Sequence, residues 1–211
     1  MDGSFLNFFS ASSLLAVGVA LIHMVSPEPG SCANATITQT YNLVRLMQAN
    51  TTVLLNTYLS HQGSPFSEPG FFNTGRLHYD GVPTIAIHFL EWRSMTDMER
   101  LGQNYRVYSI FFEFLQLIWD DQLEINPYET ELLEMLKATQ LHIKGLLSNL
   151  TGIMCSLGSP PTPLTDPLMM KVTEADTFEK KFRGSVVCYR YRQWVDRTVR
   201  DFSLLQNKYR S

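Results

Sequence analysis

Two long segments rich in proline and glycine are the features that most restrict how this chain can fold. The first runs from Gly63 toward Ser94 and begins GSPFSEPGFFNTGRLHYDGVP, and the second lies between Gly158 and Asp176 and contains SPPTPLTDP. Proline lacks an amide hydrogen and glycine favours turns, so neither segment can continue a helix. Each is nevertheless long enough to run the length of a helical bundle.

Two amphipathic stretches flank the first of these segments. Apolar residues at helical spacing predict a first helix from Ile37 to Gly63, where the glycine ends it. A second helix is predicted to start at Thr96, because Thr96 and Glu99 have the spacing of a capping box, and to end near Leu123.

Two further helices follow. Asn126 suits an N-cap and Pro127 suits a first helical position, so the third helix is predicted from there to about Leu157. Asp176 is an N-cap candidate for a fourth helix that continues to about Tyr209. The core face predicted for the second helix comprises Leu101, Tyr105, Tyr108, Phe112, Leu115 and Trp119. The core face predicted for the fourth comprises Val187, Tyr191, Trp194, Thr198 and Leu205.

The lengths of the connections predict the topology. A short turn makes the second and third helices antiparallel neighbours, whereas the two long connections allow the chain to return along the bundle and start a parallel helix. We therefore predict an all-α, long-chain four-helix bundle with up-up-down-down connectivity and two long crossover loops. An up-down-up-down bundle would need only short loops.

The N-terminal region predicts secretion. The apolar run LLAVGVALIHMV, followed at once by SPEPGS, is typical of a signal peptide over residues 1–26, although no basic residue precedes it. Cleavage after Ala33 is an alternative, as is retention of this segment as an N-terminal helix, and the helical domain is expected over residues 34–211. No later segment is apolar enough to insert in a membrane, and glycosylation tripeptides begin at Asn34, Asn50 and Asn149.

Several function classes are disfavoured. The 17 Lys and Arg residues against 20 Asp and Glu residues give a net charge of −3, so the basic surface that nucleic-acid binding requires is missing. No catalytic, cofactor-binding or metal-binding motif is present in the sequence. Cys155 and Cys188 could form a bridge, but isolated buried thiols are favoured, and Cys32 would leave with a signal peptide cut after Ala33.

An aromatic residue among charges stands at the start of the fourth helix. In TFEKKFRG, Phe178 lies about 170° around the helix from the predicted core face, and Lys181 lies three residues further on. Phe178 should therefore face outward as an apolar plate beside a positive charge, the kind of residue that anchors a protein interface. The alternative is that the preceding loop folds over it.

Four segments resemble a known family. FEKKFRG, RQWVDRTVRDFSLL, TYLSHQGSPFSEPGF and WRSMTDMERLGQNY are similar to the ciliary neurotrophic factor branch of the interleukin-6 cytokines, especially to its cardiotrophin and cardiotrophin-like members. The similarity extends from Ile37 to Ser211 and is strongest in the first and fourth helices, at the start of the first long loop and at the beginning of the second helix.

The resemblance implies receptor-binding roles for particular residues. Phe178 and Lys181 occupy the family's Phe-x-x-Lys motif, which contacts the leukaemia inhibitory factor receptor. Trp92, Arg197 and Asp201 match positions that bind the ciliary neurotrophic factor receptor α. Without the resemblance, Arg197 and Asp201 would be interpreted as a solvated charged pair. Trp194 also matches, but its place on the predicted core face favours packing.

The implied activity is binding without chemistry. Exposed faces of the first and third helices would meet the shared signal-transducing receptor chain, and the assembled receptors would activate intracellular kinases in JAK-STAT signalling. The expected product is a secreted neurotrophic or differentiation cytokine that uses no cofactor. A secreted lipid-binding bundle is the alternative, and the aromatic-rich helix faces argue against it.

Overall fold

The computed structural model describes residues 29–71, 77–162, 168 and 175–209. All regular secondary structure in these ranges is helical. The four long helices are α1 (Pro29–Gln62), α3 (Asp97–Ile125), α4 (Thr130–Ser156) and α5 (Thr177–Tyr209). A short helix, α2 (Phe89–Ser94), lies in the first crossover.

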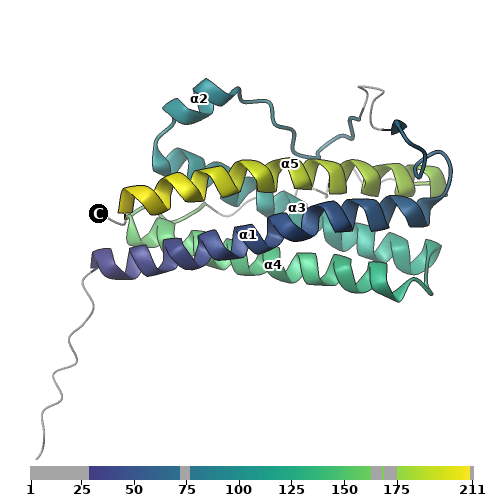
Figure 1. The fold of residues 1–211 in the computed structure, drawn as a ribbon, viewed down its shortest axis with the longest axis horizontal. Coiled ribbons are helices and arrows are strands. Elements are labelled where there is room, and N and C mark those ends of the chain that lie inside the picture. Colours follow the sequence, from purple (N-terminus) through teal and green to yellow (C-terminus); the bar gives the residue numbers. More distant parts are fainter. Residues whose placement is uncertain (1–28, 72–76, 163–167, 169–174, 210–211) are drawn as a thin grey trace, which may run out of the picture.

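The helices form a bundle in which neighbours are antiparallel. Helices α1 and α3 run in one direction and α4 and α5 in the other (Figure 1). Helix α1 packs against α4 and α5, and α3 packs against the same two helices. The parallel pairs therefore lie on the diagonals. This arrangement confirms the predicted up-up-down-down bundle with two crossovers.

The core consists mainly of the predicted helix faces. All five residues predicted for the core face of the fourth helix are buried in α5, including Trp194. In α3 the predicted face is partly wrong, because Tyr105, Phe112 and Trp119 are only half-buried whereas Phe111 and Ile118 are fully buried. The buried face is turned from the predicted one because α3 has to cover both α4 and α5.

Two of the predicted N-terminal caps are confirmed. The Thr96 hydroxyl accepts from the Glu99 amide at 3.2 Å, and a Glu99 carboxylate oxygen accepts from the Thr96 amide at 2.7 Å. The Asp176 carboxylate accepts from the Glu179 amide at 2.8 Å at the start of α5. These contacts satisfy amides that have no partner inside the helix.

Two predicted helix starts are wrong. Helix α1 begins earlier than Ile37, at Pro29, a residue type suited to a first helical turn. Helix α4 begins at Thr130, because Asn126 instead ends α3 and donates its backbone amide to the Gln122 carbonyl at 2.8 Å. The Asn126 side chain also donates to Gln122, at 2.7 Å between Nδ2 and Oε1, and the N-cap position of α4 is taken by Glu129, which makes no side-chain cap hydrogen bond.

Cys155 and Cys188, the two cysteines whose side chains the structure describes, are both free thiols. Cys188 is buried, as predicted, and burial raises its pKa to about 12. Cys155 is exposed, so the expectation that it is buried is wrong. The predicted signal peptide over residues 1–26 lies outside the described residues, and Ala33 lies within α1.

Close contact between α1 and α5 depends on Gly184. A Cβ at this position would overlap the hydroxyl and ring of Tyr58, whose Cε2 atom would be 2.9 Å away. Tyr58 is fully buried, so its ring has no free space to move into. A side chain at Gly184 would have to push the two helices apart.

We expect Gly184→Ala to lower the free energy of unfolding by about 1–3 kcal/mol or more, because it overpacks this contact. Gly152→Ala in α4 is the matched control, since its Cβ would meet nothing within 4 Å. Its expected effect is a gain of about 0.5–1 kcal/mol from helix propensity. Denaturant unfolding measures both, and equal effects of the two substitutions would contradict the proposed overlap.

Candidate functional site

The Phe178 side chain projects from the first turn of α5 and is 56% exposed. This confirms the expectation that it faces outward. The first crossover packs against one side of the ring, where the centroids of the Phe66 and Phe178 rings are 5.2 Å apart. The rest of the Phe178 ring stays uncovered. Phe182 stacks on Phe178 at 6.5 Å with an interplanar angle of 4°. Phe66 itself is buried and also lines a groove of about 420 Å³ beside α1.

Lys181 is not a free charge beside Phe178. It is half-buried, and its Nζ donates to the Gln62 carbonyl at the end of α1, at 2.8 Å. A cation at this place satisfies a carbonyl that has no partner within α1 and opposes the negative end of the helix dipole. Lys181 therefore fixes the start of α5 to the end of α1.

A buried cluster of polar side chains lies below this contact. The Gln62 amide donates to Gln122 Oε1 at 3.0 Å, and the Gln122 amide donates to the Tyr58 hydroxyl at 3.2 Å. Tyr58, Gln62 and Gln122 are each at most 1% exposed. The ends of α1 and α3 and the start of α5 are thus joined by hydrogen bonds whose donors and acceptors are away from water.

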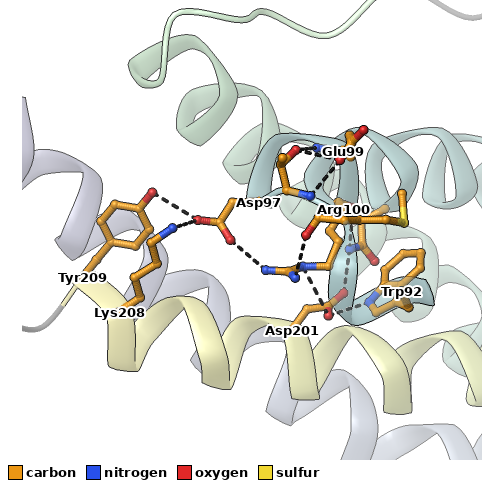
Figure 2. A network of polar contacts seen from close by, with 10 residues as sticks. Trp92, Asp97, Glu99, Arg100, Asp201, Lys208 and Tyr209 are labelled. Carbon is orange, nitrogen blue, oxygen red and sulfur yellow. Dashed lines mark hydrogen bonds and ion pairs between the residues drawn. The ribbon is translucent and has the colours of Figure 1, made fainter. Parts of the chain in front are cut away.

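Trp92 and Asp201 are buried, each 3% exposed. The Trp92 indole Nε1 donates to Asp201 Oδ1 at 2.7 Å, as Figure 2 shows. Neither side chain is available at the surface as the family resemblance implied. Both instead fix the position of α2 against α5, because the indole is held between the carboxylate and the Trp194 ring at 5.8 Å.

The Asp201 carboxylate is surrounded by donors. Asn104 Nδ2 donates to Oδ2 at 3.2 Å, and Arg100 Nε lies 3.8 Å from Oδ1. Burial raises the pKa of Asp201, and the hydrogen bonds from Trp92 and Asn104 act against this rise. The indole contact thus stabilises the ionised carboxylate.

Arg197, on α5, makes a further contact between this helix and the first crossover. Its Nη2 donates to the Ile87 carbonyl at 2.7 Å, and its guanidinium carbon lies 4.6 Å from the Trp92 ring centroid. A cation at this distance interacts with the π-system of the indole. The interpretation of Arg197 and Asp201 as a solvated pair is wrong, since Asp201 is buried and its polar contacts are with Trp92, Asn104 and Arg100.

A second carboxylate holds the beginning of α3 to the end of α5. Asp97 accepts from Arg100 Nη2 at 2.7 Å and from the Tyr209 hydroxyl at 3.4 Å, and it pairs with the Lys208 ammonium (Figure 2). Arg100 also donates to the Met95 carbonyl at 3.1 Å. The segment from α2 to α3 is therefore fixed along the last turns of α5.

Fixing α2 in this way leaves two of its apolar side chains exposed. Phe89 is 56% and Leu90 is 79% exposed, and Arg93 lies over the Phe89 ring at 5.8 Å. Sequence reasoning missed both residues. The run FLEW within a loop-like segment was the available signal, because it places apolar residues on opposite sides of one helical turn.

The three glycosylation tripeptides all lie in helices. Asn50 is exposed on α1, and Asn149 is half-buried on α4. Asn34 lies in α1, where the side chain is outside the description. In the described part of the chain, no group of three acidic, histidine or cysteine residues could hold a metal ion. None of the described helices is long and apolar enough to span a bilayer.

The chain is similar to several characterised proteins over most of its length. Residues 3–211 match the family model of plethodontid receptivity factor. Mouse cardiotrophin-2 is 41% identical over 200 residues, which cover 93% of this chain and 98% of that protein. Mouse cardiotrophin-1 is 30% identical, covering 81% and 85%, and pig ciliary neurotrophic factor is 29% identical, covering 78% and 80%.

The environment of Asp201 predicts different effects for two tryptophan substitutions. Trp92→Phe removes the donor to Asp201, so the unfolding free energy at neutral pH should fall by about 1.5–3 kcal/mol beyond the loss of ring volume. The pKa of Asp201 should rise further, so this extra loss should shrink as the pH falls and the carboxylate is protonated.

Trp194→Phe provides the matched control. Trp194 is as buried as Trp92, but its Nε1 has no partner within the described residues. The decrease in unfolding free energy caused by Trp194→Phe should therefore not depend on the pH in the way expected for Trp92→Phe. Denaturant unfolding as a function of pH compares the two variants, and identical pH dependence would mean that the indole contact does not stabilise the Asp201 carboxylate.

Proposed function

The chain belongs to the plethodontid receptivity factor family, among the interleukin-6-type cytokines, and from this membership we propose that it is a secreted ligand that assembles cell-surface receptors. The family assignment confirms the resemblance that the sequence motifs indicated. As a cytokine it acts through binding, so its function depends on which side chains the bundle presents at fixed positions.

The observation that supports this proposal best is a pair of exposed apolar anchors on different parts of one rigid bundle. Phe178 lies at the start of α5, whereas Leu90 lies on α2, beside the later half of α5 (Figure 1). Buried polar contacts hold the helical turn that carries each anchor. Anchors with immobilised supports lose little conformational freedom on binding, which favours affinity.

The first surface is proposed to bind the leukaemia inhibitory factor receptor. Its centre is Phe178, which is exposed on one side and packed against Phe66 and Phe182 on the other. Lys181 takes a different role from a free contact, because its ammonium holds the end of α1. We propose that Lys181 positions Phe178 and adds positive charge near the rim of the surface.

The second surface is proposed to bind the ciliary neurotrophic factor receptor α. The matched residues Trp92, Arg197 and Asp201 would act by positioning α2, since two of them are buried and Arg197 is engaged with Ile87. The direct contacts would be made by Phe89 and Leu90. Loss of the buried contacts would weaken binding by releasing α2.

A third receptor, the shared signal-transducing chain, is proposed to meet the outward faces of α1 and α4. These faces carry Leu46 and Val53 on α1 and Leu141 on α4, which are 49%, 52% and 68% exposed. The leukaemia inhibitory factor receptor and the shared chain, held at a fixed spacing, would bring their intracellular kinases together and start JAK-STAT signalling. The expected outcome is a neurotrophic or differentiation response.

Phe178→Ala should weaken binding to the leukaemia inhibitory factor receptor ectodomain about tenfold or more, as expected for an aromatic anchor. The free energy of unfolding should fall by no more than about 1–3 kcal/mol, because the two lost aromatic contacts are worth about 0.5–1.5 kcal/mol each and the ring is mostly exposed. Surface plasmon resonance and calorimetry on the same samples measure both. Unchanged binding with lower stability would make Phe178 a packing residue.

Leu90→Ala should have the reciprocal effect. Binding to the ciliary neurotrophic factor receptor α ectodomain should fall about tenfold, while binding to the leukaemia inhibitory factor receptor stays as in the wild type. Stability should be unaffected because Leu90 is 79% exposed. Each variant thus serves as the control for the other. If both variants weakened both interactions equally, the two-surface proposal would be wrong.

A further inference from the structure

A stripe of exposed residues follows the outward side of α1 and includes a glycosylation tripeptide. Leu46, Asn50 and Val53 lie on successive turns of one side of the helix, and all three are exposed. Val44 and Leu55, which point the other way, are at most 4% exposed. Asn50 therefore stands between two apolar side chains that are open to solvent.

The stripe borders α4 and not α5. The α5 side of α1 is marked by Gln48, whose Nε2 donates to Asp196 Oδ1 at 2.8 Å. The α4 side is marked by Leu43, whose Cδ2 lies 3.6 Å from the position of a Cβ on Gly145. Leu43 and Asn50 are two turns apart on the same side of α1, since seven residues return to nearly the same direction. Asn50 thus belongs to the face shared by α1 and α4.

The tripeptide at Asn50 is the more accessible of the two with described side chains. Asn50 and Thr52, the residue whose hydroxyl the glycosylation pattern requires, are both exposed. In the other tripeptide, Asn149 is half-buried and the Thr151 hydroxyl donates to the Leu147 carbonyl at 2.9 Å. A bulky group attached to Asn50 would extend into solvent without displacing any core side chain.

We propose that Asn50 carries an N-linked glycan, and that this glycan and a protein partner on the α1–α4 face exclude each other. In the modification, Nδ2 of Asn50 attacks the anomeric carbon of an oligosaccharide carried on a polyprenyl diphosphate. A carbon–nitrogen bond forms, the sugar–phosphate bond breaks, and the amide proton leaves with the diphosphate. The inference rests on the proposed function, because it requires passage through the secretory pathway.

The exclusion follows from size and position. Cβ atoms on adjacent turns of a helix are about 5–6 Å apart, so a branched oligosaccharide on Asn50 covers Leu46 and Val53. These are the exposed apolar residues of α1 that the shared signal-transducing chain would use. Glycan occupancy at Asn50 would therefore set the fraction of ligand that can recruit this chain, without affecting the surface around Phe178.

The test uses the full chain produced in secreting vertebrate cells. Wild type is compared with Asn50→Gln and with Thr52→Ala, two variants that remove the same glycan through different side chains. Asn149→Gln is the control, because it removes the glycosylation tripeptide on α4. Mass spectrometry of glycopeptides gives the occupancy at Asn50, and surface plasmon resonance gives the affinity for immobilised ectodomains of the shared chain and of the leukaemia inhibitory factor receptor.

We expect a glycan at Asn50 in the wild type. Both Asn50→Gln and Thr52→Ala should bind the shared chain at least about tenfold more tightly than the glycosylated protein, with unchanged binding to the leukaemia inhibitory factor receptor. Asn149→Gln should behave as wild type. Agreement between the first two variants would assign the effect to the glycan and not to the substituted side chain.

Two results would overturn the inference. One is an unmodified Asn50 in the secreted protein, and the other is equal affinity of glycosylated and unglycosylated forms for the shared chain. Failure of every form to bind either receptor would instead contradict the proposed function, while the occupancy measured at Asn50 would stand on its own.

Discussion

The packing of α5 against both α1 and α3 is the constraint on which the rest of the structure depends. Helix α5 contributes buried residues from Arg183 to Leu205, so it packs against its neighbours along most of its length. It can be antiparallel to both neighbours only if α1 and α3 run in the same direction. The chain must then cross the full height of the bundle before α3 and again before α5, which accounts for both long connections.

Buried carboxylates fix the first crossover at two levels of the bundle. Asp121 pairs with Arg183 at 2.6 Å, both side chains being at most 6% exposed, and Arg183 also donates to the Tyr79 hydroxyl at 3.4 Å. Asp201 accepts from Trp92 further along α5. Burial raises the pKa of both carboxylates, so neither gains from being buried alone. Their partners make one placement of the loop better than the alternatives.

The residues that hold each proposed receptor surface in place are different from the residues exposed on it, and this difference has a functional consequence. Residues that resemble receptor contacts in the sequence, such as Trp92 and Asp201, lie beneath the surface, and the exposed side chains are Phe89 and Leu90. At the start of α5, Lys181 similarly supports while Phe178 is exposed. A substitution at a supporting residue would thus alter binding through position, whereas a substitution at an exposed anchor would alter it through lost contact.

The sequence by itself determined the number of long helices, the caps at Thr96 and Asp176 and the topology, because periodicity, capping and connection length act over short stretches of chain. The angle of Phe178 relative to the α5 core face, a local property, predicted that it points outward, but the structure decided that the preceding loop leaves the ring exposed. The sequence could not predict the start of α4, because Asn126 forms its hydrogen bonds with α3, and it could not predict the existence of α2. Only the tertiary structure decided that Trp92 is buried, because its partner Asp201 lies 109 positions away. Burial of a loop residue depends on where the chain returns to a distant helix, and no local pattern encodes that position.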